Sequence, residues 1–148
     1  MRLWHYKLLP YLPDRQFKGQ LRELVAIMRT WRDKGQTNHL LINKIMDYDK
    51  GELCAYYMLY ENEYCNRYSK FPEVAYLKEF MEFCDYLPIC GKNKAVFSDW
   101  HNEEYLRICM ANLYEKFYYG VGKSKIAYEA WITLENGYRE ITGDDYYI

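Results

Sequence analysis

A stripe of basic residues beside one carboxylate marks the segment 14–33. At 100° per residue of a helix, its basic positions fall within about 60° of one another on a single face. These positions are Arg15, Lys18, Arg22 and Arg29, and Glu23 stands on their flank. Guanidinium groups bind phosphates, and a carboxylate can transfer protons or stabilise developing positive charge. The pattern therefore predicts a face that binds an anionic partner. The alternative is a solvated helix face on which Glu23 makes a surface ion pair worth less than about 1 kcal/mol.

Charge is unevenly distributed along the 148 residues, although the formal net charge is only −1. Residues 1–35 contain eight basic and three acidic side chains, a net charge of +5, which leaves −6 for the rest. A basic block on an otherwise acidic protein favours an anionic partner bound at one face. Nothing at the start of the chain is typical of a signal peptide, and no apolar run approaches the roughly 20 residues that span a bilayer. We therefore expect a cytoplasmic protein with no membrane partner.

The elements that position these residues are predicted to be helices. Apolar residues at spacings of three and four predict a helix from Asp14 to about Asp33, ended by Gly35. Its apolar positions are Phe17, Leu21, Leu24, Val25, Met28 and Trp31. Further helices are expected over 52–69, from Pro72 to near Pro88, and over 102–118, after an irregular lead-in over 1–13 and with a loop over 91–99. Asn136-Gly137 could mark a hairpin or an interrupted helix in the tail. The predicted fold is all-α, a single domain over 1–148 of about four helices with this open tail.

The composition includes 18 tyrosines and five cysteines. The tyrosines suit either a surface that stacks on bases or a core with wet edges, and composition leaves these two readings even. An odd number of cysteines without a CxxC pair favours reduced thiols over a disulfide framework. A zinc site from Cys84, Cys90, His101 and Cys109 matches no tetrahedral ligand spacing and is rejected. Phosphate-binding glycine loops, HExxH, GxSxG and the deaminase zinc signature are missing from the sequence.

The N-terminal segment resembles the pyrimidine-dimer DNA glycosylase family. The similarity lies in Leu12-Pro13-Asp14-Arg15-Gln16 and Gln20-Leu21-Arg22-Glu23-Leu24, with an arginine just inside the N-terminus. The start, Met1-Arg2-Leu3-Trp4, and Gly19-Gln20 before Arg22-Glu23 are similar to a bacterial branch of that family. Weaker similarity extends to His101 and to the run Asn112–Phe117, and the aromatic-basic run 114–120 is similar to a DNA-contacting segment of the family.

This resemblance implies an all-helical enzyme that excises one base of a UV-induced pyrimidine dimer and then nicks the strand. The α-amine of the first residue would attack C1′ and form an imine that undergoes β-elimination. An α-amine has a pKa near 7.7–8.0, against about 10.4 for lysine, so part of it is neutral and nucleophilic at physiological pH. By resemblance, Met1 supplies the amine, Glu23 the catalytic carboxylate, and Arg2 and Arg22 the substrate contacts.

The full set of expected functional residues follows from the resemblance and the basic face together. The expected DNA-binding residues are Arg2, Arg15, Gln16, Lys18, Arg22 and Arg29. Further candidates are His5, His101 and Lys116. The expected partner is damaged double-stranded DNA bound by a monomer that needs no cofactor and no metal. The alternative function is a non-catalytic helical protein that binds nucleic acid through the basic face of 14–33.

Three departures from the family pattern bear on this expectation. In the phage members of the family the methionine is removed and a threonine is exposed, whereas Arg2 is too large for the usual aminopeptidase, so Met1 would remain. The family has a Gln-His pair where Arg15 and Gln16 stand. A further family arginine is replaced by Ala26, with Arg29 one turn later. These changes concern the substrate contacts more than the type of reaction.

Overall fold

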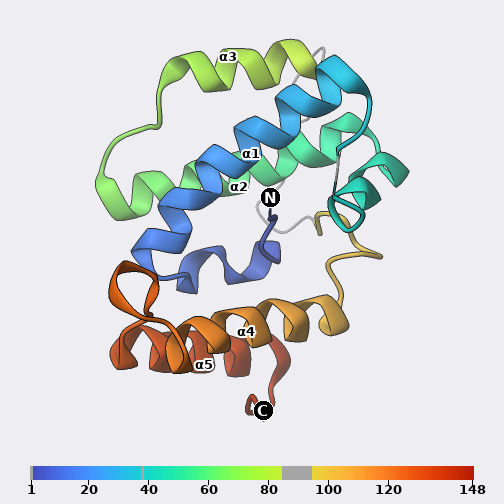
Figure 1. Cartoon of the computed structure of the whole chain (residues 1–148). Coiled ribbons are helices and arrows are strands. Elements are labelled where there is room, and N and C mark those ends of the chain that lie inside the picture. Colours follow the sequence, from blue (N-terminus) through green and yellow to red (C-terminus); the bar gives the residue numbers. More distant parts are fainter. Residues whose placement is uncertain (1, 38, 85–94) are drawn as a thin grey trace. The chain divides into compact units, whose positions relative to one another are not determined.

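The computed structural model describes residues 2–37, 39–84 and 95–148. Helices are the only regular secondary structure in those residues, which confirms the predicted all-α class. The α-helices are α1 (Asp14–Lys34), α2 (Lys50–Tyr68), α3 (Val74–Phe83), α4 (Glu103–Tyr118) and α5 (Tyr128–Thr142) (Figure 1). The 3-10 helices are η1 (Tyr6–Tyr11), η2 (Ile42–Asp47) and η3 (Gly122–Ser124). Within this part of the chain, no helix is both long and apolar enough to cross a membrane.

The chain forms two compact units that are each discontinuous in sequence. The first combines the start of the chain, up to Leu3, with Gly19–Trp100. The second combines Trp4–Lys18 with His101–Ile148. Helix α1 therefore begins in the second unit and continues into the first. The single domain expected over 1–148 stays a prediction.

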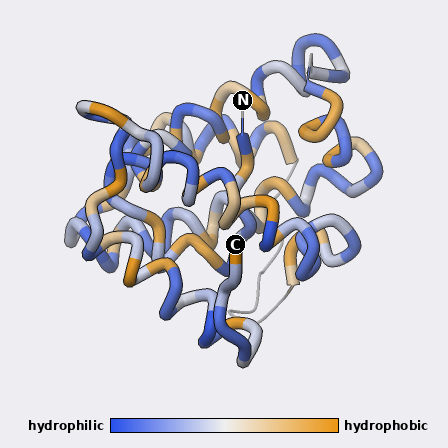
Figure 2. Tube along the Cα trace, turned by 60° about the horizontal axis from the view of Figure 1, so that its bottom comes forward, coloured by the Kyte–Doolittle hydropathy of each residue, from blue (hydrophilic) through white to orange (hydrophobic). Residues whose placement is uncertain are grey.

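Helix α1 follows the apolar pattern of the sequence closely. It begins at Asp14 and ends at Lys34, and Gly35 follows with a φ of +72°, a left-handed conformation that glycine adopts without strain. Leu24, Val25 and Met28 are buried as predicted, and Ile27 is buried beside them. Hydrophobic and hydrophilic positions recur along the helical tubes in Figure 2, as expected for amphipathic helices.

Tyrosines supply much of the core of the first unit. Tyr56, Tyr57 and Tyr60 on α2 are fully buried, and the Tyr57 ring stacks on Phe80 of α3 with centroids 4.2 Å apart. Tyr118, Tyr119, Tyr128 and Tyr147 of the second unit are exposed. The chain thus uses tyrosine both as core and as surface.

The pairing of α2 with α3 corrects the expectation for two cysteines. Cys54 on α2 and Cys84 after α3 are joined by a disulfide, with Cα atoms 6.8 Å apart. The two helices pack against each other, which brings positions 30 residues apart into disulfide range. The prediction of reduced thiols is therefore wrong for this pair. Cys90 lies outside the described residues.

Several predicted boundaries change. The lead-in contains η1, and the linker before α2 contains η2. Helix α3 spans Val74–Phe83, so Pro72 precedes it instead of opening it, and Pro88 lies outside the described residues. Residues 95–99 are non-helical as expected, and 91–94 are not described. Helix α4 begins after Asn102, whose side chain accepts a hydrogen bond from the Tyr105 amide at 2.9 Å.

The tail of the chain forms α5, which packs beside α4 and against η1 (Figure 1). It runs without interruption through Asn136-Gly137, so the two alternatives for this segment, a hairpin and an interrupted helix, are both wrong. A close approach accounts for the glycine within the helix: a Cβ on Gly137 would lie 2.4 Å from Cγ of the Tyr11 ring. The glycine makes room for that ring, and the same dipeptide that often forms a turn here sits within a helix.

We expect Gly137→Ala to destabilise the protein by about 1–3 kcal/mol, because the new methyl overlaps the Tyr11 ring. Gly19→Ala is the matched control, since nothing lies within 4 Å of a Cβ there. In α1 that substitution should stabilise by up to about 1 kcal/mol through helix propensity. Urea unfolding of the two variants measures both effects, and equal stabilisation by both would contradict the packing argument.

Candidate active site

The backbone of Arg2 meets the carboxylate of Glu23. The Arg2 amide nitrogen donates a hydrogen bond to Glu23 Oε2 at 3.2 Å, and both residues are half-buried. Glu23 therefore lies beside the start of the chain, where the resemblance requires its carboxylate. Met1 itself lies outside the described residues.

Gln20 holds the other backbone polar group of Arg2. Its Nε2 donates to the Arg2 carbonyl oxygen at 2.9 Å. Gln20 and Glu23 are three residues apart on α1, a spacing that places side chains on neighbouring positions of one helix face. The N–H and the C=O of Arg2 are thus both bound by side chains of α1. Leu3, the next residue, is fully buried.

Tyr56 of α2 binds the side-chain amide oxygen of Gln20. Its hydroxyl donates to Gln20 Oε1 at 3.1 Å, and the exposed fractions of Tyr56 and Gln20 are 0% and 1%. Sequence reasoning missed both residues. A signal was present for Gln20: it follows Phe17 by three residues and precedes Leu24 by four, so it sits on the buried stripe, where a polar side chain needs a partner. Tyr56 carried no such signal among so many tyrosines.

The predicted basic residues of α1 differ in their surroundings. Arg15, Lys18, Arg22 and Arg29 are all exposed, and Gln16 is half-buried. Lys18 makes an ion pair with Asp14 at 3.1 Å. Arg29 donates to both carboxylate oxygens of Glu79 on α3, at 2.9 and 2.6 Å. The structure therefore gives Arg29 an acidic partner within the first unit.

The two histidine candidates lie together inside the second unit. His5 Nδ1 accepts a hydrogen bond from the Lys7 amide at 3.2 Å, so its Nε2 carries the proton that is donated to the His101 carbonyl oxygen at 2.8 Å. The Tyr6 amide donates to His101 Nδ1 at 3.1 Å. Both imidazoles are buried, and these bonds connect η1 to the start of α4. This geometry gives them a structural role in the second unit.

Burial controls the protonation of this pair. It lowers the pKa of His5 to about 4, with a smaller contribution from the charge of Lys7. It also lowers the pKa of His101, and His5 adds to that effect. Both rings are therefore neutral at physiological pH. Lys116, the remaining candidate, is half-buried near the end of α4, and its carbonyl oxygen accepts a hydrogen bond from the Ile126 amide.

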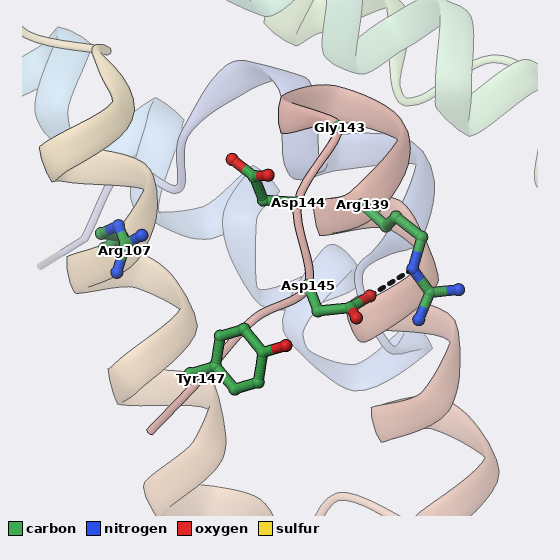
Figure 3. A pocket seen from close by; sticks show the side chains of 6 residues that line it. All are labelled: Arg107, Arg139, Gly143, Asp144, Asp145 and Tyr147. Atoms are coloured by element: carbon green, nitrogen blue, oxygen red, sulfur yellow. Dashed lines mark hydrogen bonds and ion pairs between the residues drawn. The ribbon is translucent and has the colours of Figure 1, made fainter.

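A surface cavity of about 540 Å³ lies at the end of α5 in the second unit (Figure 3). It is lined by residues of α4, α5 and the segment after α5: Arg107, Arg139, Gly143, Asp144, Asp145 and Tyr147. Arg139 Nε donates to Asp145 Oδ1 at 2.5 Å, as the dashed line in Figure 3 shows. The lining has two cationic and two anionic side chains, so their charges balance. None of the predicted site residues lines it.

The sequence model of a family described as pyrimidine dimer DNA glycosylase matches residues 1–76. That segment contains Arg2, Gln20, Glu23 and Tyr56, the four residues joined by hydrogen bonds above. No curated protein and no solved structure matches the chain.

We expect acid to destabilise the fold through the buried histidines. The folded-state pKa of His5, about 4, lies below the unfolded value of 6.5, so the unfolded chain binds protons more tightly. Stability is then lost as the pH falls from about 6.5 towards 4. For His5 the loss between pH 7 and pH 5 is about 2 kcal/mol. Urea unfolding at both values measures it, and His5→Gln should flatten the dependence. An unchanged slope in that variant would contradict the assignment.

Proposed function

The chain belongs to the pyrimidine dimer DNA glycosylase family, and from this premise we propose that it excises UV-induced pyrimidine dimers from double-stranded DNA and then cleaves the abasic strand. The observation that carries the proposal is the hydrogen bond from the Arg2 amide to Glu23. It puts a carboxylate at the start of the chain, within the segment that the family model matches.

The proposed nucleophile is the α-amine of Met1. Three covalent bonds separate the amino nitrogen of a residue from the next amide nitrogen, and their lengths add up to about 4.3 Å. An amine on the residue before Arg2 is thus kept within that distance of an atom that Glu23 already binds. This covalent limit supports the proposal that the amine and the Glu23 carboxylate act together.

The proposed reaction proceeds in two stages. The amine attacks C1′ of the damaged nucleotide, a C1′–N bond to the enzyme forms, and the glycosidic bond breaks as the base leaves with a proton. The sugar ring then opens to an imine, with the ring oxygen protonated. Loss of a proton from C2′ expels the 3′ phosphate and breaks the strand by β-elimination. Glu23 would stabilise the positive charge on the sugar and the imine, and would accept and return protons.

The exposed basic residues of α1 would hold the DNA. Arg22 is adjacent to Glu23 and exposed, which suits contact with a phosphate near the reacting sugar. Arg2, Arg15, Gln16 and Lys18 are proposed to extend this contact along the backbone. The scheme uses a monomer and requires neither metal nor cofactor. The alternative, a protein that binds nucleic acid without catalysis, would use the same face and leave Glu23 dispensable.

Borohydride reduction of the imine tests the mechanism directly. We expect a covalent protein–DNA product on duplexes that carry a thymine dimer or an abasic site, with tryptic mapping to Met1. Glu23→Gln should slow its formation by about 10²-fold, because a positioned acid–base group is lost. Glu63→Gln is the control, since Glu63 binds Arg67 on α2. An extra residue before Met1 should abolish trapping.

The two substrates separate the parts of the proposal. Trapping on the dimer supports both base excision and the lyase step. Trapping on the abasic site alone supports the lyase step and contradicts excision of dimers. Trapping that is retained both in Glu23→Gln and in the protein with an extra residue before Met1 would refute the amine mechanism. If the folded native protein binds DNA but gives no covalent product, the alternative function is favoured.

Salt dependence of binding tests the basic face. Each phosphate contact adds about 0.9 to the slope of log K against log salt concentration, because bound counterions are released. Arg22→Ala should therefore weaken binding to all sequences and lower this slope by about 1. Arg67→Ala, which removes a largely buried arginine paired with Glu63, is the matched control. An unchanged slope in Arg22→Ala would remove Arg22 from the proposed interface.

A further inference from the structure

The hydrogen bonds from Tyr56 through Gln20 end at the carbonyl oxygen of Arg2, the residue that follows the proposed nucleophile in sequence. We propose that Gln20 and Tyr56 are positioning residues, which fix the backbone of Arg2 so that the preceding amine stays beside Glu23. This inference rests on the proposed function, since it assigns a purpose to the contacts only if the amine reacts. Neither residue would touch the DNA, because both are buried.

The direction of each hydrogen bond makes the two residues dependent on each other. The Arg2 carbonyl can only accept, so Gln20 must present its NH₂ group to it. The amide oxygen of Gln20 then faces Tyr56, whose hydroxyl donates to it. Without that hydroxyl the amide could rotate by half a turn. Its oxygen would then face the Arg2 carbonyl oxygen, and the contact would become repulsive.

The two side chains of α1 act on opposite ends of the same residue. Gln20 binds the C=O of Arg2 and Glu23 binds its N–H. Leu3 is fully buried and fixes the chain on the far side of that carbonyl. Loss of the Gln20 bond removes one of the two side-chain contacts of α1 with the Arg2 backbone and leaves the other to Glu23, which must also act on the reacting sugar. A movement of about 1 Å at a reacting group can cost up to about a hundredfold in rate.

Single-turnover trapping on an abasic duplex tests the proposal. Tyr56→Phe and Gln20→Met keep the volume of each side chain and remove the hydrogen bonds. We expect the maximal rate of imine trapping to fall roughly tenfold or more, while the DNA concentration that gives half the maximal rate stays unchanged. Tyr57→Phe is the matched control: Tyr57 is equally buried, is the next residue on α2, and packs its ring on Phe80. It should retain the native rate.

A pH-dependent rescue separates positioning from a general effect on folding. In Gln20→Glu, a protonated carboxyl can donate to the Arg2 carbonyl and accept from Tyr56, as the amide does, whereas a carboxylate cannot donate. The ratio of this variant's rate to the native rate should therefore rise as the pH falls, and the Gln20→Met ratio should stay flat. Thermal unfolding of each variant under the assay conditions establishes that it is folded.

The outcomes distinguish this inference from the proposed function. No trapping by the native protein refutes the proposed function and the inference with it. Native trapping that is matched by folded Tyr56→Phe and Gln20→Met overturns the inference alone. An equal loss of rate in Tyr57→Phe, or a Gln20→Glu ratio that does not respond to pH, also overturns it.

Discussion

Two side chains of one helix satisfy both backbone polar groups of Arg2, and the candidate active site depends on that arrangement. Glu23 accepts from the amide and Gln20 donates to the carbonyl. Leaving a buried backbone group without a hydrogen-bond partner costs about 1–3 kcal/mol of stability. These two hydrogen bonds therefore fix the backbone at Arg2 in addition to packing. The same helix that supplies the carboxylate therefore also places the segment on which that carboxylate would act. Helix α1 would thus supply both the contacts that position Arg2 and the proposed catalytic carboxylate.

Charge distribution along the sequence overstates the basic character of α1. Its net positive charge is real, but the structure joins Arg29 to Glu79 on α3, and Arg32 to Asp33 and Glu79. These contacts lie within the first unit, where Glu79 of α3 and Asp33 of α1 itself partly neutralise the end of α1. Arg22, which is adjacent to Glu23 in sequence, is exposed and takes no part in these ion pairs. The proposed DNA contact is accordingly concentrated towards the first half of the helix.

Local patterns predicted α1 well because its period, its start at Asp14 and its end before Gly35 all agree. They failed at Gly137, because a glycine required by the approach of Tyr11 looks the same in sequence as one required by a turn. The same limit applies to the site. Glu23 was predicted through its family resemblance, whereas Gln20 and Tyr56 matter through a contact between residues 36 positions apart. The Cys54–Cys84 pair was missed for the same reason, since only the packing of α2 on α3 brings the sulfurs together.

The segment that matches the family model is not a self-contained folding module. Residues 4–18 belong to the second unit, and the partners of η1 come from the far end of the sequence. The His5 amide donates a hydrogen bond to Cys109 Sγ, and the His5 ring donates one to the His101 carbonyl oxygen. The Tyr11 hydroxyl donates one to the Glu140 carboxylate. A fragment that stops at residue 76 would leave all of these groups without their partners. Any transplant of the matched segment between relatives must therefore preserve the complementary surface of α4 and α5, because η1 takes its partners from those helices and from the start of α4.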